Sequence, residues 1–117
     1  MKIVIQNQFE QEHKAWQRSL EFFKQENALL KYRLSEMVDN NEENGFLQMA
    51  EYFQNKLLLK DALLNKLLKE LHELQSAEKF SEQMISAQNK LRNEVVKAEK
   101  KFLDLYSEFN KKMQQKI

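Results

Sequence analysis

Cysteine and proline are absent from this chain of 117 residues, and Gly45 is its only glycine. The lack of cysteine excludes disulfides, iron–sulfur clusters and thiolate zinc sites. Because proline and glycine are the strongest interrupters of regular structure, their near-absence leaves few places for sharp turns. The β-branched runs typical of strands are also almost missing. The chain is rich in Leu, Lys, Glu and Gln, which lose little side-chain freedom in a helix, so we expect an all-α protein.

Long apolar segments are missing as well. Ile3-Val4-Ile5 is too short for the apolar region of a signal peptide or for a membrane span, and we interpret it as an N-terminal extension. We therefore expect no membrane partner and a cytoplasmic location.

Neither sign of charge is in clear excess, because 19 basic and 18 acidic residues give a net charge of +1. A protein that binds nucleic acid needs a positive surface to displace counterions from the phosphates, so we expect no nucleic-acid partner. The basic residues between 90 and 101 alternate with acidic ones, which is typical of a solvated helix face.

Three seams of mainly apolar residues follow the chain. The first and third advance in steps of three and four residues, the spacing of a coiled-coil helix, and the members of the second share one face of a helix. The first seam consists of Phe9, His13, Trp16, Leu20, Phe23, Asn27, Leu30, Leu34 and Met37. The second consists of Phe46, Ala50, Phe53, Leu57, Leu64, Leu67, Leu68, Leu71 and Leu74. The third consists of Phe80, Met84, Ala87, Leu91, Val95, Ala98, Phe102, Leu105, Phe109 and Met113. Two consecutive steps of four around Leu91 predict a local unwinding of the supercoil in the third helix.

These seams predict one helical domain over residues 1–117, with helices at 8–38, 44–76 and 81–115. Asn7 is expected to cap the first helix and Ser81 the third, because their side-chain oxygens accept from backbone N–H groups that a helix start leaves free. Short connections make neighbouring helices antiparallel. The expected architecture is therefore an up-down-up antiparallel three-helix bundle.

The connection near residues 76–81 contains no strong helix breaker, and this leaves alternatives open. A continuous helix from Phe46 to Lys116 would exceed about 100 Å and would need a partner along its length. We favour a break, because helices of that length are rare in globular proteins. The third helix either folds back within its own chain or swaps into a neighbouring copy, in which case the bundle dimerises.

Phe9 is followed by Trp16 seven residues later in the first seam. This stretch resembles spectrin-type three-helix repeats, a likeness that many helical bundles share. The resemblance implies a three-helix architecture and nothing about function, since the same fold serves many functions.

Two polar residues, Asn27 and Lys60, interrupt the apolar seams. One interpretation is a polar layer that fixes the register of the helices and the number of partners. The other is that each side chain extends to the edge of the bundle and keeps its polar end in water. We favour the second interpretation for Lys60, with Glu94 as a possible partner, and leave both open for Asn27.

The second seam is wider than a three-helix core requires, because Tyr52, Leu59 and Leu63 extend its apolar face on one side. These residues predict a surface for a protein partner or for a second copy of the chain. Our leading hypothesis is a non-enzymatic bundle that acts through protein–protein interaction or self-association as a homo-oligomer. We find no nucleophile–base pair, phosphate-binding loop or cofactor motif, and we expect neither enzymatic activity nor a cofactor.

The alternative hypothesis is a bundle that binds a small ligand or a metal near its two histidines. Glu10 and His13 have the Glu-x-x-His spacing of di-iron bundles, but no second such motif precedes His72. If the first two helices fold back on each other about the 39–45 turn, His13 is expected to lie level with His72. We favour a histidine with a local structural hydrogen bond over a metal ligand, because two histidines are a poor ligand set.

Overall fold

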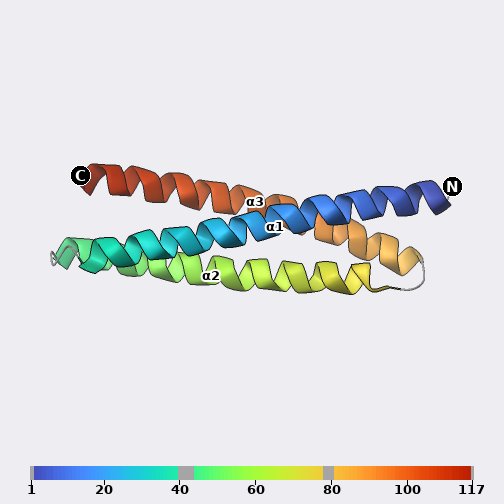
Figure 1. The fold of residues 1–117 in the computed structure, drawn as a ribbon, viewed down its shortest axis with the longest axis horizontal. Coiled ribbons are helices and arrows are strands. Elements are labelled where there is room, and N and C mark those ends of the chain that lie inside the picture. Colours follow the sequence, from blue (N-terminus) through green and yellow to red (C-terminus); the bar gives the residue numbers. More distant parts are fainter. Residues whose placement is uncertain (1, 40–43, 78–80, 117) are drawn as a thin grey trace.

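The computed structural model describes residues 2–39, 44–77 and 81–116, and helix is the only regular secondary structure in these ranges. The chain forms α1 (Lys2–Asp39), α2 (Asn44–Gln75) and α3 (Glu82–Lys116). Figure 1 shows that α2 runs antiparallel to both α1 and α3, so α1 and α3 point in the same direction. The fold is therefore the predicted all-α, up-down-up three-helix bundle.

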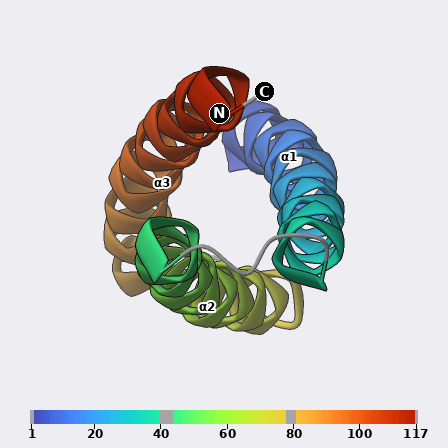
Figure 2. The same cartoon turned by 90° about the vertical axis from the view of Figure 1, so that its left-hand side faces the viewer.

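The bundle is long and narrow, with principal extents of 61 × 19 × 17 Å. Viewed along its length, the three helices surround a common axis (Figure 2). The packing is uneven, because α1 lies against α2 more extensively than against α3. The α1–α3 side of the bundle therefore has the least extensive packing between helices, and we call it the weakly closed side.

The core consists of the predicted seams, because one apolar face of each helix is hidden from water by the other two. Among the described residues, eleven leucine and phenylalanine side chains of these seams are at most 2% exposed. Phe23 of α1 packs on Phe102 of α3, and Phe53 of α2 packs on Phe109 of α3, with ring centroids 4.5 and 5.2 Å apart. These aromatic pairs join all three helices into one core.

The structure corrects one position of the third seam. Ala87 is exposed, and Gln88 is completely buried in its place. The apolar character of Ala87 suggested the wrong residue, whereas the step from Gln88 to Leu91 keeps the heptad spacing intact. The two steps of four around Leu91 therefore disappear, and with them the reason to expect unwinding there. Phe80, the first member predicted for this seam, lies outside the described residues.

Helix boundaries differ from the expected ones mainly at the beginning of α1. The helix starts at Lys2, so Asn7 lies inside it and does not cap it, and Ile3-Val4-Ile5 belongs to the helix. A capping residue permits a helix start but does not force one, and no proline or glycine precedes Asn7 to end the helix. At α3, the Ser81 hydroxyl oxygen accepts from the backbone N–H of Met84 at 3.2 Å, as an N-cap does.

The second connection falls between Gln75 and Glu82, which is where the sequence predicted a break. The backbone N–H of Ser76 still donates to the carbonyl of His72, so the helical pattern fades over Ser76 and Ala77.

Across residues 2–39, 44–77 and 81–116, no helix combines the length and the apolarity that a membrane span requires.

Candidate functional site

A polar layer crosses the interface between α1 and α2. Asn27 is completely buried, and its side-chain amide donates to the backbone carbonyl of Leu57 at 2.9 Å and to the carboxylate of Asp61. Lys31, one turn further along α1, forms an ion pair with the other oxygen of Asp61. These contacts join one level of α1 to one level of α2, so the Asn27 amide lies inside the bundle and does not extend to water.

This layer is not fully satisfied. The side-chain oxygen Oδ1 of Asn27 is buried and has no hydrogen-bond partner among the described residues. A buried acceptor without a partner destabilises a folded protein by about 1–3 kcal/mol. The unpaired Oδ1 of Asn27 therefore lowers the stability of the bundle.

A second polar cluster joins α1 to α3 near the other end of the bundle. His13 is 5% exposed, and its Nε2 lies 2.5 Å from Oε1 of the buried Gln88. Because an amide oxygen only accepts, Nε2 must carry the proton and donate it. Beside this pair, Arg92 donates from Nε and Nη2 to the two carboxylate oxygens of Glu12 at 2.6 and 2.5 Å. The fork of Arg92 thus grips a carboxylate of α1 in two places.

Arg92 and Glu12 perturb each other's ionisation. The hydrogen bond from Arg92 lowers the pKa of Glu12, against the opposing effect of burial. The same hydrogen bond raises the pKa of Arg92. The guanidinium also lies 6.0 Å from the centre of the Trp16 ring, close enough for a cation–π contact. The cluster therefore stabilises the weakly closed α1–α3 side.

The two histidines lie at different levels of the bundle and have different surroundings. Gln75 donates to Gln17 at 3.2 Å across α1 and α2, which sets His13 level with the end of α2, beyond His72. The expectation that His13 and His72 lie level was wrong, because their relative height depends on a register that heptad spacing does not specify. His72 is exposed, and His13 bonds to a residue of another helix. In the part of the chain that the structure describes, no three histidine, aspartate or glutamate side chains could hold a metal ion.

Lys60 occupies a seam position of α2 without being fully buried. Burial lowers its pKa, and the neighbouring charges of Lys101 and Lys56 lower it further, while Asp104 acts in the opposite direction. Its neighbours on α3 are thus Lys101 and Asp104 rather than the expected Glu94. Glu94 lies beside Glu70 instead, and burial and this second carboxylate raise the pKa of Glu70.

The three residues predicted to extend the face of α2 have different surroundings. Tyr52 is 44% exposed, but its hydroxyl donates to Glu108 of α3 at 2.9 Å, which raises the pKa of Tyr52. Leu63 is partly buried and packs against the core. Leu59 is 68% exposed. Of the predicted surface, Leu59 alone presents a largely uncovered apolar side chain.

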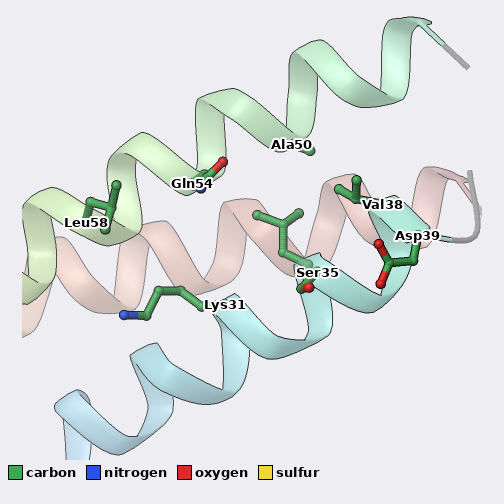
Figure 3. A pocket seen from close by; sticks show the side chains of 8 residues that line it. Lys31, Ser35, Val38, Asp39, Ala50, Gln54 and Leu58 are labelled. Carbon is green, nitrogen blue, oxygen red and sulfur yellow. The ribbon is translucent and has the colours of Figure 1, made fainter. Parts of the chain in front are cut away.

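Clefts between the helices are shallow. One cleft of about 280 Å³ lies between α1 and α2, and Figure 3 shows the side chains of both helices that line it. It contains Lys31, whose charge is already paired with Asp61. A smaller cleft of about 210 Å³ lies beside His13. Ligand sites usually enclose about 300–1,000 Å³, so these two clefts are smaller than usual. A cleft of about 390 Å³ between α2 and α3, lined by Lys60 and Lys101 among others, falls within that range.

The outer faces of the helices carry large apolar side chains that remain substantially exposed in the described part of the chain. Their exposed fractions range from 40% to 68%. They are Phe22, Leu29, Tyr32, Leu47, Tyr52, Leu58, Leu59, Val96 and Leu103. Of these residues, the sequence predicted Tyr52 and Leu59 as part of an interaction surface and did not assign the others, because burial depends on which faces the neighbouring helices cover.

The fold and these contacts define a three-helix bundle with two internal polar clusters and with large apolar side chains exposed on its outer faces. Comparison with protein-family models, with curated proteins and with solved structures found no match.

Proposed function

We propose that this protein is a non-enzymatic interaction module that binds other proteins, including further copies of itself, through the outer faces of its helices. One observation carries the proposal: large apolar side chains remain exposed although the three seams already complete the core. Single exposed apolar residues are common on proteins, but a contiguous group marks an interaction surface. On α1 such residues recur at helical spacing, as Phe22, Leu29 and Tyr32 do.

The internal polar clusters fit this proposal better than a binding or catalytic role. Asn27, Gln88 and His13 are buried and bonded to other helices, so they hold the bundle together and are not accessible to a substrate. An interaction module needs rigid helices of fixed relative height, because its outer surface is assembled from several turns. The polar clusters supply that rigidity.

Affinity capture with a matched variant tests the proposal. The wild-type chain and a variant with Phe22→Gln, Leu29→Gln and Leu103→Gln are used as bait under identical conditions. All three positions are more than half exposed, so the variant keeps its helical circular dichroism spectrum and its melting temperature. We expect specific partners, or additional copies of the chain, to be retained by the wild type and lost by the variant. Identical retention by both proteins would contradict the proposal.

A further inference from the structure

The outer face of α1 carries a second periodic stripe, on the side opposite its core seam. Each of its members lies two positions after one of the core-seam residues between His13 and Leu34. We call it the α1 outer stripe. A shift of two positions corresponds to about 200° around a helix. Every member of the stripe is exposed. The members are Ala15, Arg18, Phe22, Gln25, Leu29, Tyr32 and Glu36.

The middle of the stripe has the composition of an interface. Phe22, Leu29 and Tyr32 are 54%, 56% and 63% exposed, and no other helix of the chain lies over them. Phe22 rests against the buried Phe23 with ring centroids 5.6 Å apart, which orients its ring. Outer faces of water-exposed helices normally concentrate charge. Between Arg18 and Glu36, however, this stripe contains none.

The two charges at the ends of the stripe indicate what covers it. Arg18 lies nine residues before Asn27 and Glu36 lies nine residues after it. A two-fold axis at the level of Asn27 therefore places Arg18 of each copy opposite Glu36 of the other when the two helices run antiparallel. The same operation places Phe22 opposite Tyr32. In a parallel pair, like charges would face each other at both ends and oppose the contact.

We propose that α1 packs antiparallel against α1 of a second copy through the α1 outer stripe, which makes the protein a two-fold symmetric dimer. This inference rests on the proposed function and specifies its partner. Residues 15–39 of the two helices overlap over about 36 Å. Within the bundle the Tyr32 hydroxyl hydrogen-bonds to Glu36, so the carboxylate is already oriented at the end of the stripe.

Charge reversal tests the pairing. Because of the two-fold axis, Arg18→Glu creates two repulsive contacts, and we expect it to weaken dimerisation about tenfold, measured by sedimentation equilibrium. The double variant Arg18→Glu/Glu36→Arg restores opposite charges and the wild-type affinity, although it contains the same substitution. Both positions are exposed, and circular dichroism confirms that each variant is folded. Equal weakening by the single and the double variant would overturn the pairing.

Leu29→Glu and Leu59→Glu form a matched pair for the apolar contact. Both leucines are exposed, by 56% on α1 and 68% on α2, and both variants add one negative charge. We expect Leu29→Glu to abolish dimerisation and Leu59→Glu to leave it unchanged. Loss of the dimer in Leu59→Glu alone would assign the interface to α2 and overturn the proposal.

The absence of cysteine allows a direct test of the antiparallel register. Ala28 lies one residue from the proposed axis, next to its own copy, whereas Gln11 is separated from its copy by about 48 Å along the helices. With a short thiol-specific cross-linker, Ala28→Cys is expected to form a covalent dimer and Gln11→Cys to remain monomeric. Cross-linking at both positions would indicate a parallel pair, and cross-linking at neither would remove this interface.

The two proposals fail separately. A chain that is monomeric in sedimentation but still loses a captured partner on outer-face substitution would contradict the dimer and leave the interaction function standing. A chain that is monomeric and captures the same proteins as its outer-face variant would contradict both.

Discussion

Replacing Asn27 by leucine should stabilise the bundle, although it removes two hydrogen bonds. Leucine has nearly the shape of asparagine, with two methyl groups in place of the amide oxygen and nitrogen. The partners of Asn27 are not left without bonds. The carbonyl of Leu57 keeps its hydrogen bond within α2, and Asp61 keeps its ion pair with Lys31.

The magnitude follows from three terms. The two lost hydrogen bonds cost about 3 kcal/mol in total, because the one to the Asp61 carboxylate involves a charged acceptor. Removing the unpaired oxygen Oδ1 recovers about 1–3 kcal/mol. Burying a leucine side chain at this fully enclosed position contributes about another 2 kcal/mol. The sum is a stabilisation of about 1 kcal/mol, which corresponds to a rise in melting temperature of about 4 °C for a chain of this length.

Thermal and urea unfolding monitored by helical circular dichroism measure this change. Asn27→Ala is the control, because it removes the same hydrogen bonds but leaves a void, and it should lower the melting temperature. A lower melting temperature for Asn27→Leu than for the wild type would refute the reasoning. It would mean that the hydrogen bonds of Asn27 outweigh its unpaired oxygen and that the layer serves stability rather than register.

Three further predictions concern the other polar positions. His13→Leu leaves Gln88 without its buried partner, and Gln88→Leu does the same to His13, so each single substitution should destabilise the bundle by about 1–3 kcal/mol. The double variant leaves neither group unpaired and should be more stable than either single variant in urea unfolding. The pKa of Glu12 is lowered in the folded protein, so its ion pair with Arg92 stabilises the fold. This stabilisation is about 0.5–1 kcal/mol at pH values above the ordinary glutamate pKa of about 4.3. This stabilisation is lost as the pH falls through the lowered pKa of the folded protein. Glu12→Gln should therefore be less stable than the wild type at pH 7 and about equally stable near pH 2. Because burial lowers the pKa of Lys60, its charge is unfavourable at neutral pH, and Lys60→Leu should raise the melting temperature by about 4 °C.

The core could be predicted from the sequence because the period of apolar residues determines locally which face of a helix is buried. Phe9, Leu20 and Leu67 needed no knowledge of the other helices to be placed inside. Gln88 was missed because its polarity outweighed its heptad position. The spacing around it, from Met84 to Gln88 to Leu91, was the signal that pointed to it.

Contacts between helices could not be predicted in the same way, because they depend on how far one helix is displaced along another. Lys60 was expected beside Glu94 and lies near Asp104, and His13 was expected level with His72 and bonds to Gln88. The α1 outer stripe was missed for a related reason. Only the assembled bundle shows that Phe22 and Tyr32 remain more than half exposed among the described residues.

Sedimentation equilibrium of the unmodified chain tests the central claim most directly, namely that the outer face of α1 binds a second copy. The account predicts a mass that approaches twice the 14.1 kDa of the chain as concentration rises, together with a monomeric Leu29→Glu variant. A mass that stays at 14.1 kDa up to millimolar concentration would contradict the claim, as would a dimer that Leu29→Glu leaves intact.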